Sequence, residues 1–220
     1  MIVQIYEATE PQEARSLAQA GVDHVGVLVG WGTYPREVPP KRARAIFEAL
    51  PLGTHSAALS LSPDLQEILS LVERIRPDII HIGTLPEHLP PESMTVLRKH
   101  LPSTKIMRSI PVQGERSLET AKRFAETADF LLLDSYAEGD TQIGATGAVH
   151  DWSVSRRIVE AVNVPVILAG GLGPGNVGRA IAQVRPQGVD SKTKTDRYGS
   201  HRKDLEQVRE FVKAARSSSF

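Results

Sequence analysis

Short apolar runs alternate with amphipathic stretches along the whole chain, at a spacing of about 25 residues, and this rhythm restricts the possible folds more than any other feature. It predicts eight strand-helix units in 220 residues. The apolar runs that predict strands occupy residues 2–6, 24–29, 56–61, 79–83, 105–110, 130–134, 164–169 and 188–191, the last being the least apolar. The stretches with helical periodicity occupy residues 11–21, 39–50, 62–75, 90–101, 117–128, 152–162, 174–184 and 203–215.

Eight such units in a chain of this length predict an α/β fold, a single-domain TIM (β/α)8 barrel over residues 1–220, because closing the sheet removes both exposed edges. A doubly wound open sheet is the structural alternative. Local signals also indicate helix ends. Ser117 is expected to cap the fifth helix, Pro63 to lie in the first turn of the third, and Gly21 to end the first. In either fold a ligand belongs at the carboxyl ends of the strands.

Composition excludes several classes of function. The chain has no cysteine, which rules out disulfides, thiolate metal sites and a cysteine nucleophile. Lysine plus arginine and aspartate plus glutamate number 26 each, so no excess positive charge predicts a nucleic-acid or anionic-membrane partner. The histidines lack metal-ligand spacing, and no segment has the length needed to cross a bilayer. We therefore expect a soluble, cytoplasmic protein without a metal or other cofactor, as a monomer or homodimer.

Two loops at the strand ends are candidates for holding an anion. After the seventh predicted strand, Gly170, Gly171 and Gly173 precede a helix that begins near Asn176. Glycines let backbone amides approach a ligand, and a helix N-terminus adds partial positive charge. The eighth loop offers further donors, and in TIM barrels these two loops frequently bind phosphate together. The alternatives are a tight turn and a solvated polar loop. The eighth-loop donors are Ser191, Lys192, Thr193, Lys194 and Thr195.

Several motifs together resemble the phosphoribosylanthranilate isomerase family, the TIM barrels of the tryptophan pathway. They are LLLDS at 131–135, GATGAVHDW at 144–152, LAGGLGPGNVGRAI at 168–181 and VRPQGVD at 184–190. Residues 33–44 and 202–212 resemble the family's segments after strand two and in the last helix. The resemblance implies an acid-base Amadori rearrangement of an aminoaldose phosphate to an aminoketose.

In the family, an aspartate at the end of strand six and a cysteine at the end of strand one form the acid-base pair. Asp134 matches the aspartate, and partial burial at a strand end is expected to raise its pKa; a structural carboxylate is the alternative. The cysteine is absent. The family's lysine-isoleucine-cysteine-glycine reads Gln4-Ile5-Tyr6-Glu7 here, so Tyr6 stands at the cysteine position, and Glu7 is the neighbouring carboxylate expected to pair with Asp134.

Further candidate substrate ligands follow from the same comparison. Arg36 matches an arginine that faces the substrate's aromatic carboxylate, with a surface arginine as the alternative. His81 stands at the family's glutamine, as a proton carrier, a substrate ligand or a partly buried structural histidine. Arg108 replaces a frequent lysine and keeps its charge. The loop at 144–152 supplies Gly144, Thr146 and Gly147, whereas His150 and Asp151 are expected to stabilise the start of the sixth helix.

The sequence therefore predicts a phosphosugar isomerase with a phosphorylated, sugar-like substrate. Phosphoribosylanthranilate is implied by the resemblance, and a related aminosugar phosphate outside tryptophan biosynthesis is a rival substrate because the thiol is missing. A barrel that has lost catalysis and binds a phosphorylated ligand in a regulatory role is the alternative function.

Overall fold

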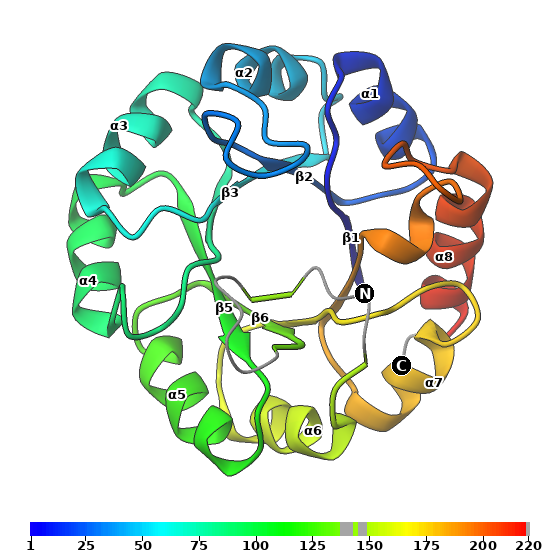
Figure 1. Cartoon of the computed structure of the whole chain (residues 1–220). Helices are drawn as coiled ribbons and strands as arrows, with labels where there is room; N and C mark the ends of the chain where they lie inside the picture. Colours follow the sequence, from blue (N-terminus) through cyan, green and yellow to red (C-terminus); the bar gives the residue numbers. More distant parts are fainter. Residues whose placement is uncertain (137–142, 145–148, 219–220) are drawn as a thin grey trace.

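The protein is a closed barrel of parallel strands, as seen down its axis in Figure 1. The computed structural model describes residues 1–136, 143–144 and 149–218. Within them, eight strands pair in chain order and β8 closes on β1, which confirms the TIM barrel and excludes the open sheet. The strands are β1 (Ile2–Ile5), β2 (His24–Leu28), β3 (His55–Ser60), β4 (Ile79–Ile82), β5 (Lys105–Pro111), β6 (Phe130–Asp134), β7 (Val166–Leu168) and β8 (Gly188–Ser191).

The helices form a ring outside the strands (Figure 1). Apolar side chains fill the layer between this ring and the sheet. A second, smaller cluster occupies the barrel interior and includes Met107, Leu132 and Ile167. The helices are α1 (Pro11–Gln19), α2 (Pro40–Glu48), α3 (Leu65–Ile75), α4 (Pro91–His100), α5 (Glu115–Ala125), α6 (Trp152–Ala161), α7 (Val177–Val184) and α8 (Leu205–Ser217), with a 3-10 turn η1 (Thr193–Thr195) after β8.

Two of the predicted helix starts are wrong by two or three residues. Helix α5 begins after Gly114, and the Ser117 hydroxyl lies inside its first turn, where it accepts a hydrogen bond from the Gln113 amide. Helix α3 is capped by Asp64, whose carboxylate accepts hydrogen bonds from two amides of the first turn, so Pro63 lies outside the helix. A carboxylate at the residue before the helix accepts hydrogen bonds from the free amides of the first turn, whereas a proline side chain has no acceptor atom.

Other predicted ends are confirmed. Gly21 follows α1 with a φ of 93°, a left-handed conformation that glycine adopts without steric cost. Asp151 caps α6 and accepts a hydrogen bond from the Ser153 amide, while His150 lies 2.7 Å from the Ser155 hydroxyl.

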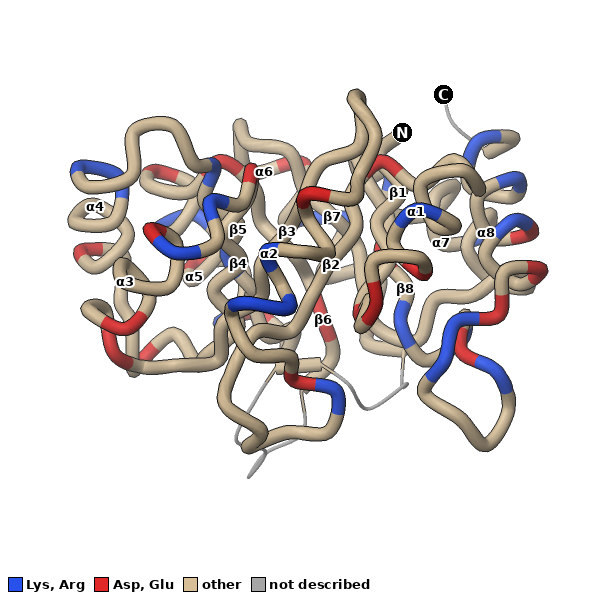
Figure 2. The backbone as a smooth tube through the Cα atoms, turned by 90° about the horizontal axis from the view of Figure 1, so that it is seen from above, with Lys and Arg blue, Asp and Glu red and all other residues tan. Residues whose placement is uncertain are grey.

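The barrel has two distinct ends, and Figure 2 shows them from the side. The N-terminus lies at one end, and the long loops after β2 and β8 lie at the other. Because all strands run parallel, their carboxyl ends gather at this second end. Several side chains that the sequence singled out, among them Tyr6, Glu7 and Asp134, are therefore brought to one mouth.

Candidate active site at the carboxyl ends of the strands

A cavity of about 220 Å³ opens at this mouth. Its wall carries three carboxylates, from Glu7, Asp134 and Asp190, together with Arg36, Lys192 and His81. Apolar side chains that include Leu59, Leu61, Leu132 and Ile143 complete the lining. An apolar cavity with a few convergent polar groups is the usual form of a small-molecule site.

Asp134 ends β6, and Gly144 lies against its carboxylate. The Gly144 amide donates a 2.8 Å hydrogen bond to the Ser135 carbonyl, which brings Gly144 to the strand end. An ideal Cβ on Gly144 would lie only 2.0 Å from Asp134 Oδ2, so a side chain other than glycine's hydrogen does not fit there. The Ser135 amide donates to Oδ1 at 2.7 Å. Burial raises the pKa of the Asp134 carboxyl to about 6, as expected from the sequence.

Tyr6 points into the barrel from the end of β1 and is tied to a neutral histidine. Its hydroxyl lies 2.9 Å from His81 Nδ1, and His81 Nε2 lies 2.7 Å from the Ser109 hydroxyl. Burial lowers the pKa of His81 to about 3, so the ring carries no charge at neutral pH. Burial also raises the pKa of Tyr6 well above its usual value. Neither group is therefore a proton acceptor of useful strength, and His81 is a buried histidine bonded to side chains.

We expect Tyr6→Phe to keep most of the enzyme's turnover and to lower its stability. The substitution retains the ring but leaves His81 Nδ1 without its 2.9 Å partner, and an unsatisfied buried polar group costs about 1–3 kcal/mol. Urea denaturation would measure the change in the free energy of unfolding. Tyr198→Phe, on a fully exposed side chain, is the matched control. Loss of turnover with unchanged stability would contradict this assignment.

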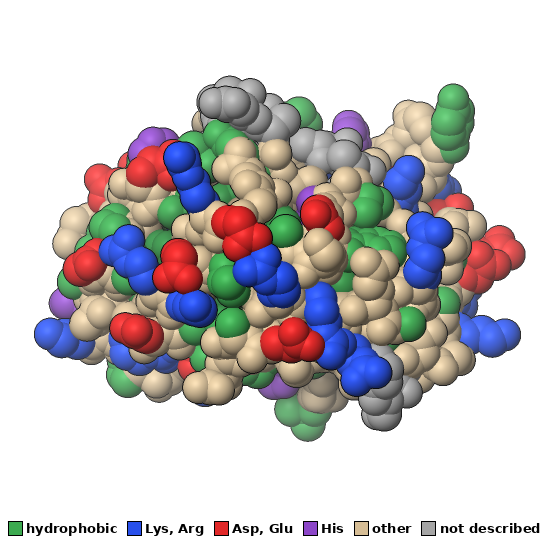
Figure 3. Space-filling view, turned by 90° about the horizontal axis from the view of Figure 1, so that it is seen from below, with side chains coloured by type: hydrophobic (Ala, Val, Ile, Leu, Met, Phe, Trp, Pro, Cys, Tyr) green, Lys and Arg blue, Asp and Glu red, His purple; other side chains and the backbone are tan. Residues whose placement is uncertain are grey.

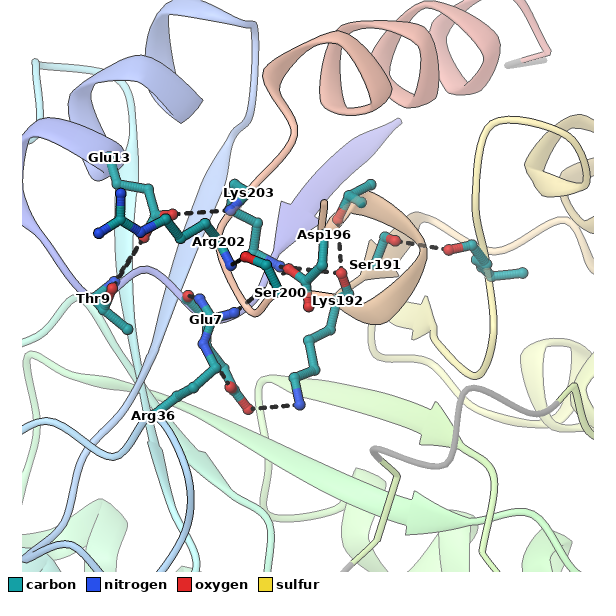
Figure 4. Close-up of polar contacts among 12 residues, drawn as sticks. Glu7, Thr9, Glu13, Arg36, Ser191, Lys192, Asp196, Ser200, Arg202 and Lys203 are labelled. Atoms are coloured by element: carbon teal, nitrogen blue, oxygen red, sulfur yellow. Dashed lines mark hydrogen bonds and ion pairs between the residues drawn. The ribbon is translucent and has the colours of Figure 1, made fainter. Parts of the chain in front are cut away.

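Glu7 lies between two cations, as Figure 4 shows. One carboxylate oxygen is 3.4 Å from Arg36 Nε and the other is 3.5 Å from Lys192 Nζ. Arg36 also contacts Asp196 at 3.5 Å, and its side chain is only 5% exposed, so the alternative of a surface arginine is wrong. The Arg36 guanidinium and the Lys192 ammonium, both expected to face substrate anions, are thus neutralised in part by the protein itself.

The loop after β8 is built on a buried lysine that the sequence analysis did not single out. Lys203 Nζ donates to the Lys192 carbonyl at 3.1 Å and to Asp196 Oδ1 at 2.6 Å, and its side chain is fully buried. Such a network holds the loop in a defined shape, while the side chains of Thr193 and Lys194 within it are exposed to solvent. Lys203 lies twelve residues beyond the end of β8, and nothing in the sequence indicated that the chain would fold back there toward the mouth.

The loops after β7 and β8 meet around a small recess of about 30 Å³. Gly170 and Gly171 have φ values of 84° and 61°, and the Ser191 hydroxyl donates to the Leu172 carbonyl at 2.7 Å, which fastens one loop to the other. Among the described residues, the backbone amides of Gly171, Thr193 and Lys194 donate no hydrogen bond. The recess lining consists of Asp134, Gly170, Gly171, Leu172, Asp190, Ser191, Lys192, Thr193 and Lys194.

Two predicted anion ligands have a structural role instead. The Gly173 amide donates to Asn176 Oδ1 at 2.8 Å, and Asn176 Nδ2 donates to the Gly171 carbonyl at 3.1 Å. Both groups are consumed inside the turn and do not line the recess. A Cβ on Gly173 would also lie 2.7 Å from the Cβ of Lys194, so glycine allows the two loops to pack closely.

Arg108 does not belong to the site, and its assignment as a substrate ligand is wrong. It is fully buried in the layer between sheet and helices, where Nη1 donates to the carbonyls of Ile82 and Thr84 at 2.7 Å. Its guanidinium carbon lies 4.8 Å from the centre of the Phe124 ring on α5. Successive residues of a strand face opposite sides, so Met107 points into the barrel and Arg108 points outward.

Asp190 is a site residue that the sequence analysis missed. It lies on β8 in register with Gln4 of β1, lines both the cavity and the recess, and is 7% exposed. Its Oδ1 is buried and has no hydrogen-bond partner among the described residues. Burial, followed by the charge of Asp134, raises the pKa of its carboxyl to about 8. The available signal was the same one that marked Asp134, a carboxylate at the end of an apolar run.

Thr146 and Gly147, predicted as substrate ligands, lie outside the described residues.

On the face shown in Figure 3, acidic and basic side chains are interspersed over the helices. Within the described ranges, no group of three acidic, histidine or cysteine side chains could hold a metal ion. In the same part of the chain, no helix combines the length and the apolar character needed to cross a membrane.

A larger cavity, of about 580 Å³, lies beside the mouth between the loops after β2 and β3 and helix α3. It shares Tyr34 and Leu61 with the mouth cavity, and its charged lining residues are Glu37, Glu67 and Arg74. The buried carboxylates of the mouth, Glu7, Asp134 and Asp190, do not line this larger cavity. Fold and mouth together define a TIM-barrel protein with buried carboxyls of raised pKa beside an amide-lined recess.

Comparison with known proteins narrows this class to one family. Residues 3–214 match the family described as N-(5'-phosphoribosyl)anthranilate (PRA) isomerase. A relative of that name from Methanocella arvoryzae is 34% identical over 97% of each chain, and one from Haloferax volcanii is 32% identical over 98% of this chain and 93% of its own. The chain belongs to the phosphoribosylanthranilate isomerase family.

Solved structures agree with this assignment. The N-(5'-phosphoribosyl)anthranilate isomerase of Pyrococcus furiosus superposes with a TM-score of 0.79 at 27% identity, over 99% of both chains. The phosphoribosyl anthranilate isomerase of Thermus thermophilus has a TM-score of 0.81 at 24% identity, again over 99% of both chains, and shows the shared fold.

Proposed function

We propose that this protein isomerises N-(5'-phosphoribosyl)anthranilate, an aminoaldose, to the corresponding aminoketose, as a step of tryptophan biosynthesis. The family assignment supports the substrate. The observation that carries the chemistry is the position of Asp134: one buried carboxyl, with a pKa raised to about 6, lies on the wall shared by the mouth cavity and the recess between the loops after β7 and β8. A ligand in the cavity with its phosphate at the recess has this carboxyl beside its sugar.

Asp134 is assigned as the base of the reaction. The Ser135 amide and hydroxyl both donate to Oδ1, and these bonds stabilise the ionised form. After the furanose ring opens to the imine, the carboxylate takes the proton from C2, and the C2–H electrons form the C1–C2 double bond of an enolamine. A base with a pKa of about 6 is ionised at neutral pH and still accepts a proton effectively.

The substrate phosphate is assigned to the recess. Amides of Gly171, Thr193 and Lys194 that make no other hydrogen bond among the described residues supply donors, and Lys192 supplies charge. Arg36 is the proposed ligand of the anthranilate carboxylate, with Glu7 holding it in place in the free protein.

Gly171→Val is expected to raise KM by about 10-fold or more, since each 1.4 kcal/mol of lost phosphate binding is a factor of ten, while kcat changes less. A β-branched residue does not tolerate the φ of 61° found there, so the amides of the turn must move. Steady-state kinetics and competitive inhibition by inorganic phosphate measure the effect. Gly175→Ala, where a Cβ meets nothing within 4 Å, is the matched control. Unchanged inhibition by phosphate in the valine variant would show that the recess does not bind the substrate phosphate.

The function itself is tested by turnover and by genetics. We expect the purified protein to consume phosphoribosylanthranilate, generated in situ from anthranilate and phosphoribosyl pyrophosphate, with loss of anthranilate-type fluorescence. We also expect the gene to restore growth of a tryptophan auxotroph that lacks this isomerase. A folded protein that binds reduced 1-(o-carboxyphenylamino)-1-deoxyribulose 5-phosphate, the compound bound in one related structure, but turns over no substrate would favour a binding role instead.

A further inference from the structure

Each nitrogen of the Arg36 guanidinium faces an oxygen of the protein. Nη2 donates to the Glu7 carbonyl, Nη1 donates to Asp196 Oδ1 at 3.5 Å, and Nε lies 3.4 Å from a carboxylate oxygen of Glu7. With 5% of the Arg36 side chain exposed, these contacts cover the guanidinium almost completely. A ligand carboxylate that is to pair with Arg36 therefore has to displace one of the groups that cover it.

Two of the three covering groups are firmly held. The Glu7 carbonyl belongs to the backbone. Asp196 Oδ1 also accepts a 2.6 Å hydrogen bond from Lys203 Nζ, and the Lys203 side chain is fully buried. Moving Asp196 would leave this buried ammonium without its counter-ion, and an uncompensated buried charge is strongly destabilising. Asp196 is thus not the group that gives way.

The Glu7 carboxylate is held more loosely than the other two groups. Its oxygens lie 3.4 Å from Arg36 Nε and 3.5 Å from Lys192 Nζ, whereas a charge-assisted hydrogen bond of this kind measures about 2.7–2.9 Å. Among the described residues, its Oε2 has no hydrogen-bond partner. Glu7, Arg36 and Lys192 all line the mouth cavity. A ligand in this cavity can therefore displace the Glu7 carboxylate with the least loss of bonding.

The carboxylate at position 7 is a feature of this chain, since the family's lysine-isoleucine-cysteine-glycine motif has glycine there. The proposed substrate carries two anionic groups, a carboxylate assigned to Arg36 and a phosphate assigned to the recess beside Lys192. Glu7 places a further negative charge between the same two cations (Figure 4). Because like charges placed together oppose association, Glu7 is unfavourable for a ligand that brings both anions.

We propose that Glu7 is a specificity-determining residue that competes with the ligand carboxylate for Arg36. In the free protein its carboxylate occupies the position of the ligand carboxylate, which spares Arg36 and Lys192 from being buried without a counter-ion. When substrate binds, the Glu7 side chain turns away and the aromatic carboxylate takes its place. This inference rests on the isomerase function argued above. Glu7 takes no part in the proton transfers and acts on binding alone.

Two ligands that differ by one carboxyl group test this inference. We expect Glu7→Gln to bind reduced 1-(o-carboxyphenylamino)-1-deoxyribulose 5-phosphate about 10-fold more tightly than the unchanged protein, because the competing charge is gone. Its affinity for reduced 1-phenylamino-1-deoxyribulose 5-phosphate should change much less. The second ligand retains the phosphate, so it accounts for any effect through Lys192. Isothermal titration calorimetry measures both affinities. Glu48→Gln, which removes an exposed partner of Arg44, is the control.

A structural role for Glu7 predicts the opposite result. If Glu7 served only to hold Arg36 in place, Glu7→Gln would bind the carboxylated ligand more weakly. An unchanged or lowered preference for that ligand over the one without the carboxyl group would therefore overturn the inference. Glu7→Gly, which restores the family's residue, should show the same gain and replaces Glu7→Gln if that variant does not fold. If the unchanged protein binds neither ligand and turns over no phosphoribosylanthranilate, the proposed function itself fails.

Discussion

Replacing Asp134 with asparagine is expected to lower kcat/KM for phosphoribosylanthranilate by about 10²–10⁴-fold, the usual contribution of a positioned acid-base group. An amide of the same shape keeps the hydrogen bond from the Ser135 amide, so the fold and the binding of substrate should persist. The effect should therefore fall on kcat and leave KM nearly unchanged. The acid limb of the pH profile, set by the pKa of about 6, should disappear with the carboxyl.

The direction of the acid limb follows from the protonation state in which the Asp134 carboxyl can act as a base. Burial raises the pKa of Asp134, and a base acts only when ionised, so activity is lost as pH falls through about 6 and is present above it. Asp151→Asn, at the start of α6, makes the same chemical change where asparagine remains a good cap and should leave the profile intact. A normal rate in the Asp134→Asn variant would show that Asp134 is not the base of the reaction.

Gly144→Ala should lower kcat by about 10²-fold, because a misplacement of about 1 Å at a reacting group has effects of this size. The new Cβ would lie 2.0 Å from Asp134 Oδ2, so either the carboxyl or residue 144 has to move. Both movements expose Asp134 to water, which should lower its pKa toward the usual value. The acid limb of the pH profile would then shift to lower pH while the rate falls.

Backbone strain has to be separated from contact with Asp134 in this test. Gly144 has a φ of 83°, and alanine is strained there in any environment. Gly53→Ala provides the comparison, since Gly53 has a φ of 90° and a Cβ there meets nothing within 4 Å. Equal stability losses in the two variants with a rate loss in Gly144→Ala alone would assign the effect to the carboxyl. Unchanged kcat in Gly144→Ala would show that the enclosure of Asp134 does not matter.

Sequence patterns predicted the barrel and its mouth because they depend on local and repetitive signals. Eight apolar runs, each followed by an amphipathic stretch, leave few ways to bury all faces. The same reasoning identified the glycine turn at Gly170 and Gly171, since a glycine cluster at the end of a buried strand is visible in the sequence. Asp134 was identified by the family resemblance and by its place at the end of an apolar run. Asp190 carries this signal too, on a strand too short and too weakly apolar to attract attention.

The errors have a shared physical origin. Arg108 was assigned to the site because it stands where the family has a frequent lysine, and a strand buried on both faces has no polar alternation to show that its side chain points outward. The Gly173 amide and Asn176 looked like ligands, but their atoms are consumed by the turn they form. Ser117 looked like a helix cap, yet its hydroxyl is used inside the first turn. In each case the hydrogen-bond partner that the polar group finds in the folded protein decided its role, and that partner is not apparent from the sequence.

The order of strands and helices, the end of the barrel that holds the site and the carboxylate of β6 were determined by the sequence itself, because periodicity and strand-end position are properties of the chain alone. The charge state of that carboxylate, the capture of Glu7 by Arg36 and Lys192, and the entry of Asp190 into the same cavity were decided by tertiary structure. These depend on burial and on distances between residues far apart in the chain, which exist only once the barrel has closed.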